Sequence, residues 1–334
     1  MTQAILLVGG LGTRLMPLTR NSPKPMLPIA GLPITEHQLV KAKKAGITSL
    51  VLATSYLSDV FIPYFGDGSR WGMRVQYAVE EEPLGTGGGI RNASQFLNDE
   101  ELIVILNGDV LSSHDLAGQI RYHKEHEADV TLHLTHVDDA RPFGCVPLDE
   151  EGRVIAFLEK MDNPVVNTIN AGCYVFSPRV IEEIPAGRSV SIEREIFPSL
   201  IAREKPIFGV VDDSYWIDLG TPRALLQGSA DVVSGLANGD ALDRLGITNR
   251  SKEFVVLEGA TIHPTAFVGG GSSLGFNSKL MEGSEVIGSI VCANATIMQN
   301  ARVVNSFVAE GAIVKAGVDI SNAYVSLDGI ENLD

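Results

Sequence analysis

The sequence predicts an α/β domain with a mostly parallel sheet, followed by a parallel β-helix. Up to about residue 230, short runs rich in Val, Ile and Leu alternate with segments of helical periodicity, the pattern of parallel strands joined by helices. After about residue 250 the apolar residues recur at every sixth position, which is typical of a parallel β-helix. A chain of 334 residues suggests about two domains, and we place them at residues 1–235 and 254–334, joined by a linker over 236–253.

Buried parallel strands are expected where a short apolar run is bounded by Gly, Ser or Asn. Three such runs are residues 4–8, 50–53 and 102–106. Helices are expected over residues 35–45, 115–126 and 222–234. Thr221 and Pro222 suit the cap and the first position of the last helix. Residues 128–159 are richer in strands, with a turn at 149–152, and predict an antiparallel insertion.

The β-helix is predicted from eleven aliphatic positions spaced six residues apart, with a frame slip of one residue at two places where the spacing is five. These positions are Ile262, Val268, Leu274, Leu280, Val286, then Val291, Ile297, Val303, then Val308, Val314, Ile320. Ala or Ser stands two residues before each of them except Ile320, where Val318 takes that place. The aliphatic residue is expected to fill the interior, and the small one to fit a tight corner. Eleven steps at three per coil predict between three and four coils.

Composition and charge exclude several classes of function. The net charge of −15 argues against nucleic acid, because neutralising phosphates requires clustered Lys and Arg. No apolar run approaches the roughly 18 residues of a membrane span, and no basic segment precedes the apolar N-terminus as in a secretory signal. Three cysteines without a CxxC spacing predict buried free thiols. We therefore expect a cytoplasmic protein with no membrane partner.

A glycine-rich segment follows the first expected strand and predicts an anion site. Residues 9–15 read GGLGTRL, so backbone amides can converge on an anion, and Arg14 adds a multidentate cation. The spacing is neither that of a P-loop nor that of a dinucleotide fingerprint, because Leu15 stands where the third glycine would be. Lys24 lies between two prolines that restrict its backbone, although a solvated loop charge is the alternative interpretation.

Two carboxylates are candidate metal ligands. Asp109 follows the strand 102–106 in an NGD sequence, and the carboxyl end of a parallel strand is where α/β folds bind ligands. Asp218 lies in the run WIDLGTP, between an expected strand and a helix start. Two carboxylates, triphosphate oxygens and water would make a magnesium site. The alternatives are a turn residue and an acid near a helix cap.

These motifs resemble those of the sugar-1-phosphate nucleotidyltransferases, closest to the mannose-1-phosphate guanylyltransferases (GDP-mannose pyrophosphorylases). The longest match is GGLGTRLMPLTRNSPKPMLPI at residues 9–29, and further motifs extend to Pro222. The resemblance implies a Rossmann-like nucleotidyltransferase domain followed by a left-handed parallel β-helix of hexapeptide repeats. It also implies that Mg²⁺ is held by Asp109 and Asp218, and that Arg14 and Lys24 hold a triphosphate.

The resemblance places the nucleotide on the first glycine segment and on EEEPLGTGGG at residues 80–89, which resembles the base loop of the family. Glu80 could accept hydrogen bonds from guanine, although a solvated acidic loop is the alternative. The implied nucleotide-binding residues are Leu7, Gly9, Gly10, Gly12, Thr13, Glu80, Gly85, Thr86 and Gly87.

The sugar phosphate is placed by three further motifs, FGCV at 143–146, FLEK at 157–160 and NAGCY at 170–174. They imply that backbone without side chains approaches the sugar, that carboxylate and amide groups bind its hydroxyls, and that an ammonium group binds its phosphate. The implied residues are Gly144, Glu159, Lys160, Asn170 and Glu193, the last of which could instead be a plain acid at a helix start. Met161 departs from the family, which commonly has proline there.

The implied reaction converts GTP and mannose 1-phosphate into GDP-mannose and pyrophosphate. Other base and sugar pairs of the same chemistry stay open: UDP-glucose, ADP-glucose, dTDP-glucose and GDP-heptose. A non-catalytic subunit that senses nucleotide sugars should lose Lys24, Asp109 or Asp218 first, and all three are present. An added acyltransferase activity is disfavoured, because the β-helix is short and His263 lies at the edge of its first coil. The family implies a homo-oligomer that assembles through the β-helix.

Overall fold

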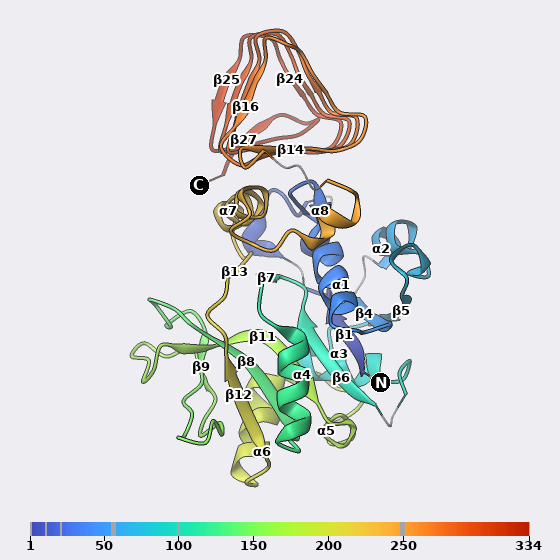
Figure 1. The fold of residues 1–334 in the computed structure, drawn as a ribbon, viewed down its shortest axis with the longest axis vertical. Coiled ribbons are helices and arrows are strands. Elements are labelled where there is room, and N and C mark those ends of the chain that lie inside the picture. Colours follow the sequence, from blue (N-terminus) through green and yellow to red (C-terminus); the bar gives the residue numbers. More distant parts are fainter. Residues whose placement is uncertain are drawn as a thin grey trace. The chain divides into compact units, whose positions relative to one another are not determined.

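The computed structural model describes residues 2–10, 12–20, 22–54, 58–98, 101–247 and 251–333 (Figure 1). The chain divides into two compact units. One consists of Met1–Gly10 and Gln38–Trp216, the other of Leu11–His37 and Ile217–Asp334. The boundaries predicted at residues 235 and 254 differ from these and stay a prediction. Residues 248–250 of the predicted linker lie outside the described residues.

The first unit contains a mixed sheet. Its strands are β1 Thr2–Leu7, β4 Ser49–Thr54, β5 Arg74–Val79, β6 Leu102–Asn107, β8 Val130–His136, β9 Gly144–Cys145, β10 Leu158–Glu159, β11 Thr168–Phe176 and β12 Ile207–Val211. Strands β6, β1, β4 and β5 are neighbours in that order and parallel. Strand β11 joins β6 antiparallel and continues the sheet to β9 and β10, while β8 lies between β11 and β12. The predicted strands and the antiparallel insertion are confirmed, and β8 additionally pairs parallel with β12.

Both faces of the parallel part are buried, which explains why its strands read as continuous apolar runs. Successive side chains of a strand point to opposite faces. Ile5, Val51 and Ile105 belong to a core cluster on one face, together with residues of the helices. Their neighbours Leu6 and Leu52 on the opposite face are buried as well.

The helices confirm the three predicted from periodicity. They are α1 Ile34–Lys44, α2 Ser58–Phe65, α3 Gly85–Ser94, α4 Leu116–Glu125, α5 Pro178–Glu182, α6 Phe197–Ala202, α7 Pro222–Ser234 and α8 Asp240–Arg244. The carboxylate of Asp115 caps α4 by accepting a hydrogen bond from the Gly118 N–H (2.9 Å). Thr221 caps α7 through a hydrogen bond from the Ala224 N–H (3.1 Å), and Pro222 is its first residue, as predicted.

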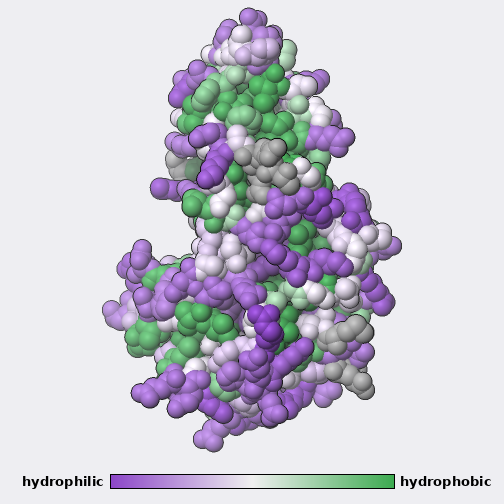
Figure 2. All heavy atoms as spheres, in the orientation of Figure 1, coloured by the Kyte–Doolittle hydropathy of each residue, from purple (hydrophilic) through white to green (hydrophobic). Residues whose placement is uncertain are grey.

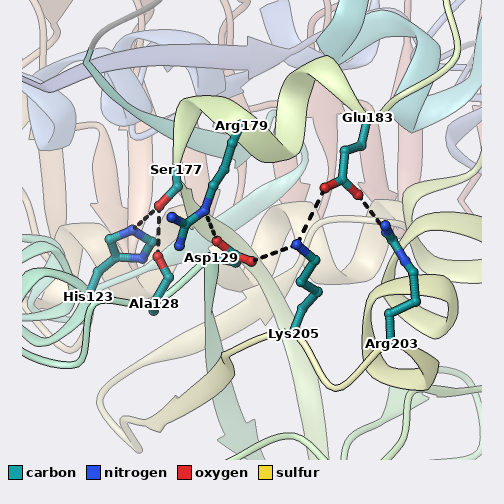
Figure 3. A network of polar contacts seen from close by, with 8 residues as sticks. All are labelled: His123, Ala128, Asp129, Ser177, Arg179, Glu183, Arg203 and Lys205. Carbon is teal, nitrogen blue, oxygen red and sulfur yellow. Dashed lines mark hydrogen bonds and ion pairs between the residues drawn. The ribbon is translucent and has the colours of Figure 1, made fainter.

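A network of charged side chains joins α5 to the start of β8 and to the segment before β12 (Figure 3). Asp129 is buried and forms ion pairs with Arg179 and Lys205. Lys205 also lies 3.8 Å from Glu183, which pairs with Arg203. A buried carboxylate is stable only with such partners. The network therefore holds these segments together at the end of β11 that is remote from Asn170.

The second unit begins with the segment after β1. This segment contains 3-10 turns at Thr13–Leu15 and Lys24–Met26 and the hairpin β2 Pro28–Ile29 and β3 Leu32–Pro33. Strand β13, Trp216–Asp218, leads from the first unit into α7. The hydroxyl of Ser229 on α7 accepts a hydrogen bond from the Ala30 N–H (2.9 Å). Arg20 pairs with Glu331 at the end of the β-helix (2.6 Å).

The β-helix consists of three parallel sheets around a triangular core (Figure 1). The first contains β14 Phe254–Val256, β17 Ser272–Leu274, β20 Ile290–Val291, β23 Phe307–Val308 and β26 Ala323–Val325, with the antiparallel β27 Ile330–Asn332 at its edge. The second contains β15 Thr261–Ile262, β18 Lys279–Leu280, β21 Thr296–Ile297 and β24 Ile313–Val314. The third contains β16 Phe267–Gly269, β19 Glu285–Ile287, β22 Arg302–Val304 and β25 Asp319–Ser321.

The predicted interior of the β-helix is confirmed. All eleven aliphatic positions line its core, with Ile262 only partly buried at the edge. The repeat extends further than predicted in both directions. Val256 aligns with Leu274, and Val325 aligns with Val308, so each continues the aliphatic column by one step.

The frame slips occur at one corner, between the third and the first sheet. Gly288, Asn305 and Asn322 occupy this corner in successive coils with positive φ, which makes the turn tighter. Ser289 and Ser306 follow the first two of these turns and Ala323 follows the third, and all three are buried and link the coils. Ser289 donates its backbone N–H to the Ser272 hydroxyl (3.1 Å), and Ser306 donates to Ser289 in the same way (3.0 Å). The small residue at this corner therefore forms hydrogen bonds in addition to fitting a narrow space.

The cysteines are free, and Cys145 and Cys173 are buried as predicted, whereas Cys292 is only half-buried. Within the described parts of the chain, no helix combines the length and the apolarity that crossing a bilayer requires.

Candidate active site

The carboxyl ends of β1 and β6 bring Gly9, Gly10 and the NGD sequence to the same edge of the sheet. Leu7 pairs with Asn107, and the Gly108 N–H donates to the Leu7 carbonyl (2.9 Å). A Cβ at Gly108 would lie 2.5 Å from that carbonyl oxygen, so only glycine permits the chain to pass this close to the end of β1. The half-buried Asp109 follows directly. The first unit therefore places Leu7, Gly9, Gly10 and Asp109 at the edge where α/β folds bind ligands.

Asn107 is a candidate site residue that the sequence analysis did not single out. Its Oδ1 atom is buried and has no hydrogen-bond partner within the described residues. Its amide packs against Gly172, where a Cβ would lie 3.0 Å from the Asn107 Nδ2. Because a buried acceptor without a partner is costly, a ligand group at this edge would compensate it. The signal in the sequence was its place beside Asp109 in the NGD motif.

The glycines of the predicted base loop belong to a helix. Residues 85–89 form the start of α3, and only residues 80–84 precede it as a loop. A Cβ at Gly87 would lie 2.9 Å from Val190 Cγ1, and one at Gly88 would lie 2.8 Å from the Arg188 carbonyl oxygen. These glycines therefore allow α3 to approach residues 188–190 closely, and Gly87 is buried. We expected their backbone groups to approach the nucleotide, and that role of Gly85 and Gly87 stays a prediction.

Glu80 organises the loop that precedes α3. Its Oε2 accepts a hydrogen bond from the Leu84 N–H (3.1 Å). Burial raises the pKa of the Glu80 carboxyl, while this hydrogen bond acts in the opposite direction. Glu80 is thus not the solvated loop acid of the alternative interpretation.

The sugar-side motifs meet on β9, β10 and β11. Gly144 pairs with Glu159 across β9 and β10, and a Cβ at Gly144 would lie 2.8 Å from Glu159 Oε2. Burial raises the pKa of the Glu159 carboxyl, the Lys160 ammonium lowers it, and the nearby Glu193 carboxylate raises it. Lys160 is exposed in a left-handed conformation (φ 51°), with its Nζ 3.9 Å from Glu159.

Asn170 is held by its own strand. Its Nδ2 donates to the Tyr174 hydroxyl (2.8 Å), and its Oδ1 accepts from the Gly172 N–H (3.1 Å). The Trp216 indole N–H donates to the Ala171 carbonyl (3.0 Å) and the ring packs edge-to-face on Phe143. The FGCV and NAGCY motifs and the tryptophan of WIDLGTP thus pack together in the first unit.

Glu193 lies in a π-helical turn, Ile192–Ile196, whose cap is Ser191. Its Oε2 accepts hydrogen bonds from the hydroxyls of Thr86 (2.8 Å) and Ser191 (2.9 Å). Half-buried and oriented by two donors, it differs from the plain helix-start acid of the alternative interpretation.

The second unit collects both cations predicted for the triphosphate and the second carboxylate. Gly12 has φ 61°, and a Cβ there would lie 3.0 Å from the Lys24 Cβ. Lys24 is buried, whereas Thr13 and Arg14 are exposed. A Cβ at Gly220 would collide with the Asp218 carboxylate and lie 3.3 Å from Arg14 Nη2, so these two side chains flank Gly220.

The predicted site residues thus fall into two sets. The first unit holds Leu7, Gly9, Gly10, Glu80, Gly85, Thr86, Gly87, Asp109, Gly144, Glu159, Lys160, Asn170 and Glu193. The second holds Gly12, Thr13, Arg14, Lys24 and Asp218. Within the described residues, no group of three or more His, Cys, Asp or Glu side chains is placed to hold a metal ion.

Comparison with known proteins decides the family. The family model described as nucleotidyl transferase matches residues 3–235. The chain belongs to the nucleotidyl transferase family. The mannose-1-phosphate guanylyltransferase of Mycobacterium tuberculosis is 49% identical over 289 residues, which are 86% of this chain and 79% of that protein. A probable mannose-1-phosphate guanylyltransferase 1 of Oryza sativa subsp. japonica is 36% identical over 82% of this chain and 74% of its own length.

Two solved structures share the fold. A putative glucose-1-phosphate thymidylyltransferase from Bacillus anthracis aligns with a TM-score of 0.64 at 22% identity, over 69% of this chain and 94% of its own. HddC from Yersinia pseudotuberculosis, solved with GMP-PN, aligns with a TM-score of 0.59 at 28% identity, over 69% of this chain and 98% of its own. The resemblance carried by the motifs and the predicted fold are confirmed.

Proposed function

We propose that this nucleotidyl transferase makes GDP-mannose and pyrophosphate from GTP and mannose 1-phosphate. The observation that carries the proposal is the 49% identity, over most of both chains, to a mannose-1-phosphate guanylyltransferase. The HddC structure with GMP-PN supports a guanine nucleotide within this fold. The proposal also draws on a carboxylate, an ammonium and an amide group of the first unit that suit a sugar phosphate, those of Glu159, Lys160 and Asn170.

The chemistry is a direct displacement. A phosphate oxygen of mannose 1-phosphate forms a bond to the α-phosphorus of GTP, and the bond from that phosphorus to the β-bridging oxygen breaks. The bonding electrons leave with pyrophosphate, and no proton moves at the reacting atoms. The attacking phosphate is already anionic near neutral pH, because the second pKa of a phosphomonoester is about 6. The protein therefore contributes positioning and charge neutralisation.

The cations are assigned to separate phosphates. Lys24 and Arg14 of the second unit would hold the triphosphate, with Lys24 restrained between Pro23 and Pro25. Lys160 of the first unit would hold the phosphate of the sugar, because it directly follows Glu159, the last residue of β10. Glu159 and Asn170 would bind the sugar hydroxyls, and Glu80 would order the loop next to the base.

Asp109 and Asp218 would hold Mg²⁺. Both carboxylates are half-buried, and carboxylate oxygens are the ligands that Mg²⁺ prefers, usually with phosphate oxygens and water completing the shell. When bound, the ion would neutralise charge on the triphosphate and on the departing pyrophosphate. The close approach of Gly108 to the end of β1 would position Asp109 as a ligand. Asp218 would be positioned by its place at the end of β13, before the cap of α7.

A matrix of nucleoside triphosphates against sugar 1-phosphates, with pyrophosphate release as the readout, tests the substrate assignment. GTP with mannose 1-phosphate should be the most efficient pair. A higher kcat/KM for UTP, ATP or dTTP, or for a glucose or heptose phosphate, would refute it. Lys24→Ala should raise KM for GTP, and Lys160→Ala should raise KM for mannose 1-phosphate. If both variants raised only the KM for GTP, the placement of Lys160 would be wrong.

We also propose that the chain assembles as a homo-oligomer through its β-helix. Figure 2 shows apolar side chains on the visible surface of this domain. Large apolar residues there are strongly exposed, among them Phe267 (55%), Ile313 (58%) and Leu327 (79%). Light scattering over micromolar concentrations tests the proposal, and a strict monomer would contradict it. The cytoplasmic setting stays a prediction.

A further inference from the structure

We propose that Thr86 is a positioning residue that acts through Glu193 and couples the nucleotide loop to the sugar pocket. This inference deepens the proposed function and rests on it for the identity of the two substrates. It changes the role that the resemblance implies for Thr86, which was expected to contact the nucleotide, and it keeps Glu193 on the side of the sugar.

The hydroxyl of Thr86 forms hydrogen bonds within the protein both as a donor and as an acceptor. It donates a hydrogen bond to Glu193 Oε2 (2.8 Å) and accepts one from the Ile192 N–H (2.9 Å). A hydroxyl has a single hydrogen to donate. The Thr86 side chain therefore has no second hydrogen for a nucleotide oxygen, although its position at the start of α3 lies within the segment expected to bind the nucleotide.

The carboxylate of Glu193 is oriented by this contact. The Ser191 hydroxyl donates to the same oxygen, Oε2, at 2.9 Å. Within the described residues, the hydrogen bonds to this carboxylate converge on Oε2, so Oε1 keeps its lone pairs for a ligand hydroxyl. The Glu193 carboxylate raises the pKa of the Glu159 carboxyl, so the two carboxylates lie near one another in the first unit. Thr86 and Ser191 thus set the orientation of a group that faces the sugar.

Backbone hydrogen bonds join the same two segments on either side of Thr86. The Gly87 N–H donates to the Val190 carbonyl (2.8 Å), and the Val190 N–H donates to the Leu84 carbonyl (2.9 Å). The Leu84 N–H in turn donates to Glu80. Residues 80–87 and 190–193 therefore form one hydrogen-bonded body. A nucleotide that orders residues 80–87 would order Glu193 at the same time.

The test replaces the hydroxyl without changing its volume. Thr86→Val removes both hydrogen bonds and keeps the branched shape, while Thr86→Ser restores them. We expect Thr86→Val to raise KM for mannose 1-phosphate about tenfold, the effect of losing one hydrogen bond of about 1.4 kcal/mol, with KM for GTP within about twofold. Thr86→Ser should return KM for the sugar phosphate to within about twofold of the original. Thr261→Val, an exposed threonine on β15, is the matched control.

A double-mutant cycle identifies the route of the effect. Because Thr86 acts through Glu193, Thr86→Val combined with Glu193→Gln should be little worse than Glu193→Gln alone. Additive losses, or a rise in KM for GTP without one for the sugar phosphate, would overturn the proposal. If Thr86→Val does not fold, the cycle of Ser191→Ala with Glu193→Gln measures the same orientation of Oε2, and additivity there refutes it.

Failure of the proposed function gives a different result. If the parent chain prefers another triphosphate and sugar phosphate, the same cycle is measured with that pair, and the split between the two KM values still tests the coupling. A parent chain that makes GDP-mannose while Thr86→Val leaves both KM values unchanged refutes the coupling alone.

Discussion

The parallel sheet of the first unit and the β-helix of the second both bury parallel strands, but they differ in where they carry residues that could bind a ligand. In the sheet, helices join successive strands and both faces are apolar, so the candidate site groups lie at or beyond the strand ends, as at Asn107 and Asp109 at the end of β6. In the β-helix, the chain turns a corner every few residues, and each parallel strand contributes one aliphatic side chain to the interior. In the β-helix the sequence repeat therefore determines the packing of the interior, whereas in the sheet the residues at the strand ends determine where a ligand would bind.

The largest expected effect tests the strand-end carboxylates. Asp109→Asn or Asp218→Asn should lower kcat at least about 10²-fold, because each removes a preorganised charge from the reacting phosphates. Both residues are half-buried outside the core clusters, so the melting temperature should change little. Asp328→Asn, an exposed acid after β26, is the control. Full activity in both site variants would remove the metal assignment.

The next effect tests the repeating interior. Ile297→Ala should lower the free energy of unfolding by about 2–4 kcal/mol, since Ile297 is fully buried and its loss leaves a cavity between neighbouring coils. Lys279→Ala on the adjacent strand β18 should change it by less than about 0.5 kcal/mol, because that side chain is exposed. Denaturant unfolding measures both. Equal effects in the two variants would contradict the assignment of inward and outward positions.

A third effect separates stability from chemistry within the first unit. Asp129→Asn should cost about 1–3 kcal/mol of folding stability, because the buried carboxylate loses its ion pairs with Arg179 and Lys205. The value of kcat should be unchanged at temperatures where the variant is folded, since Asn170 lies at the other end of β11. A fall in kcat without a fall in stability would show that this network influences the site.

The smallest effect concerns Lys41, whose ammonium donates to the Ser112 carbonyl (2.9 Å) and lies 2.7 Å from His114 Nδ1. Burial lowers the pKa of Lys41 to about 8 from 10.5. Below pH 8 the folded and unfolded chains both carry the proton. Between these two values only the unfolded chain keeps it, so stability rises with pH.

Between pH 7.5 and 9.5, the parent chain should therefore gain about 1–2 kcal/mol of folding stability relative to Lys41→Gln. Urea unfolding of both proteins at the two pH values measures the difference. A difference that does not vary with pH would mean that Lys41 is solvated in the folded protein.

Local patterns explain what the sequence predicts well. The strands β1, β4 and β6, the helices α1, α4 and α7 and the interior of the β-helix all depend on residues close together in the chain. The start of α3 at Gly85 was not predicted, because its glycines are required by contact with residues 188–190, about a hundred positions away. The bond between Thr86 and Glu193 spans 107 residues and was missed for the same reason.

The measurement that tests the central claim most directly follows the oxygen atoms of the sugar phosphate. Mannose 1-phosphate labelled with ¹⁸O in its phosphate group is incubated with GTP, Mg²⁺ and the protein, and both products are analysed by mass spectrometry. Attack on the α-phosphorus predicts that GDP-mannose carries the whole label, including its bridging oxygen, and that pyrophosphate carries none. Label in pyrophosphate, or the absence of GDP-mannose, would contradict the account.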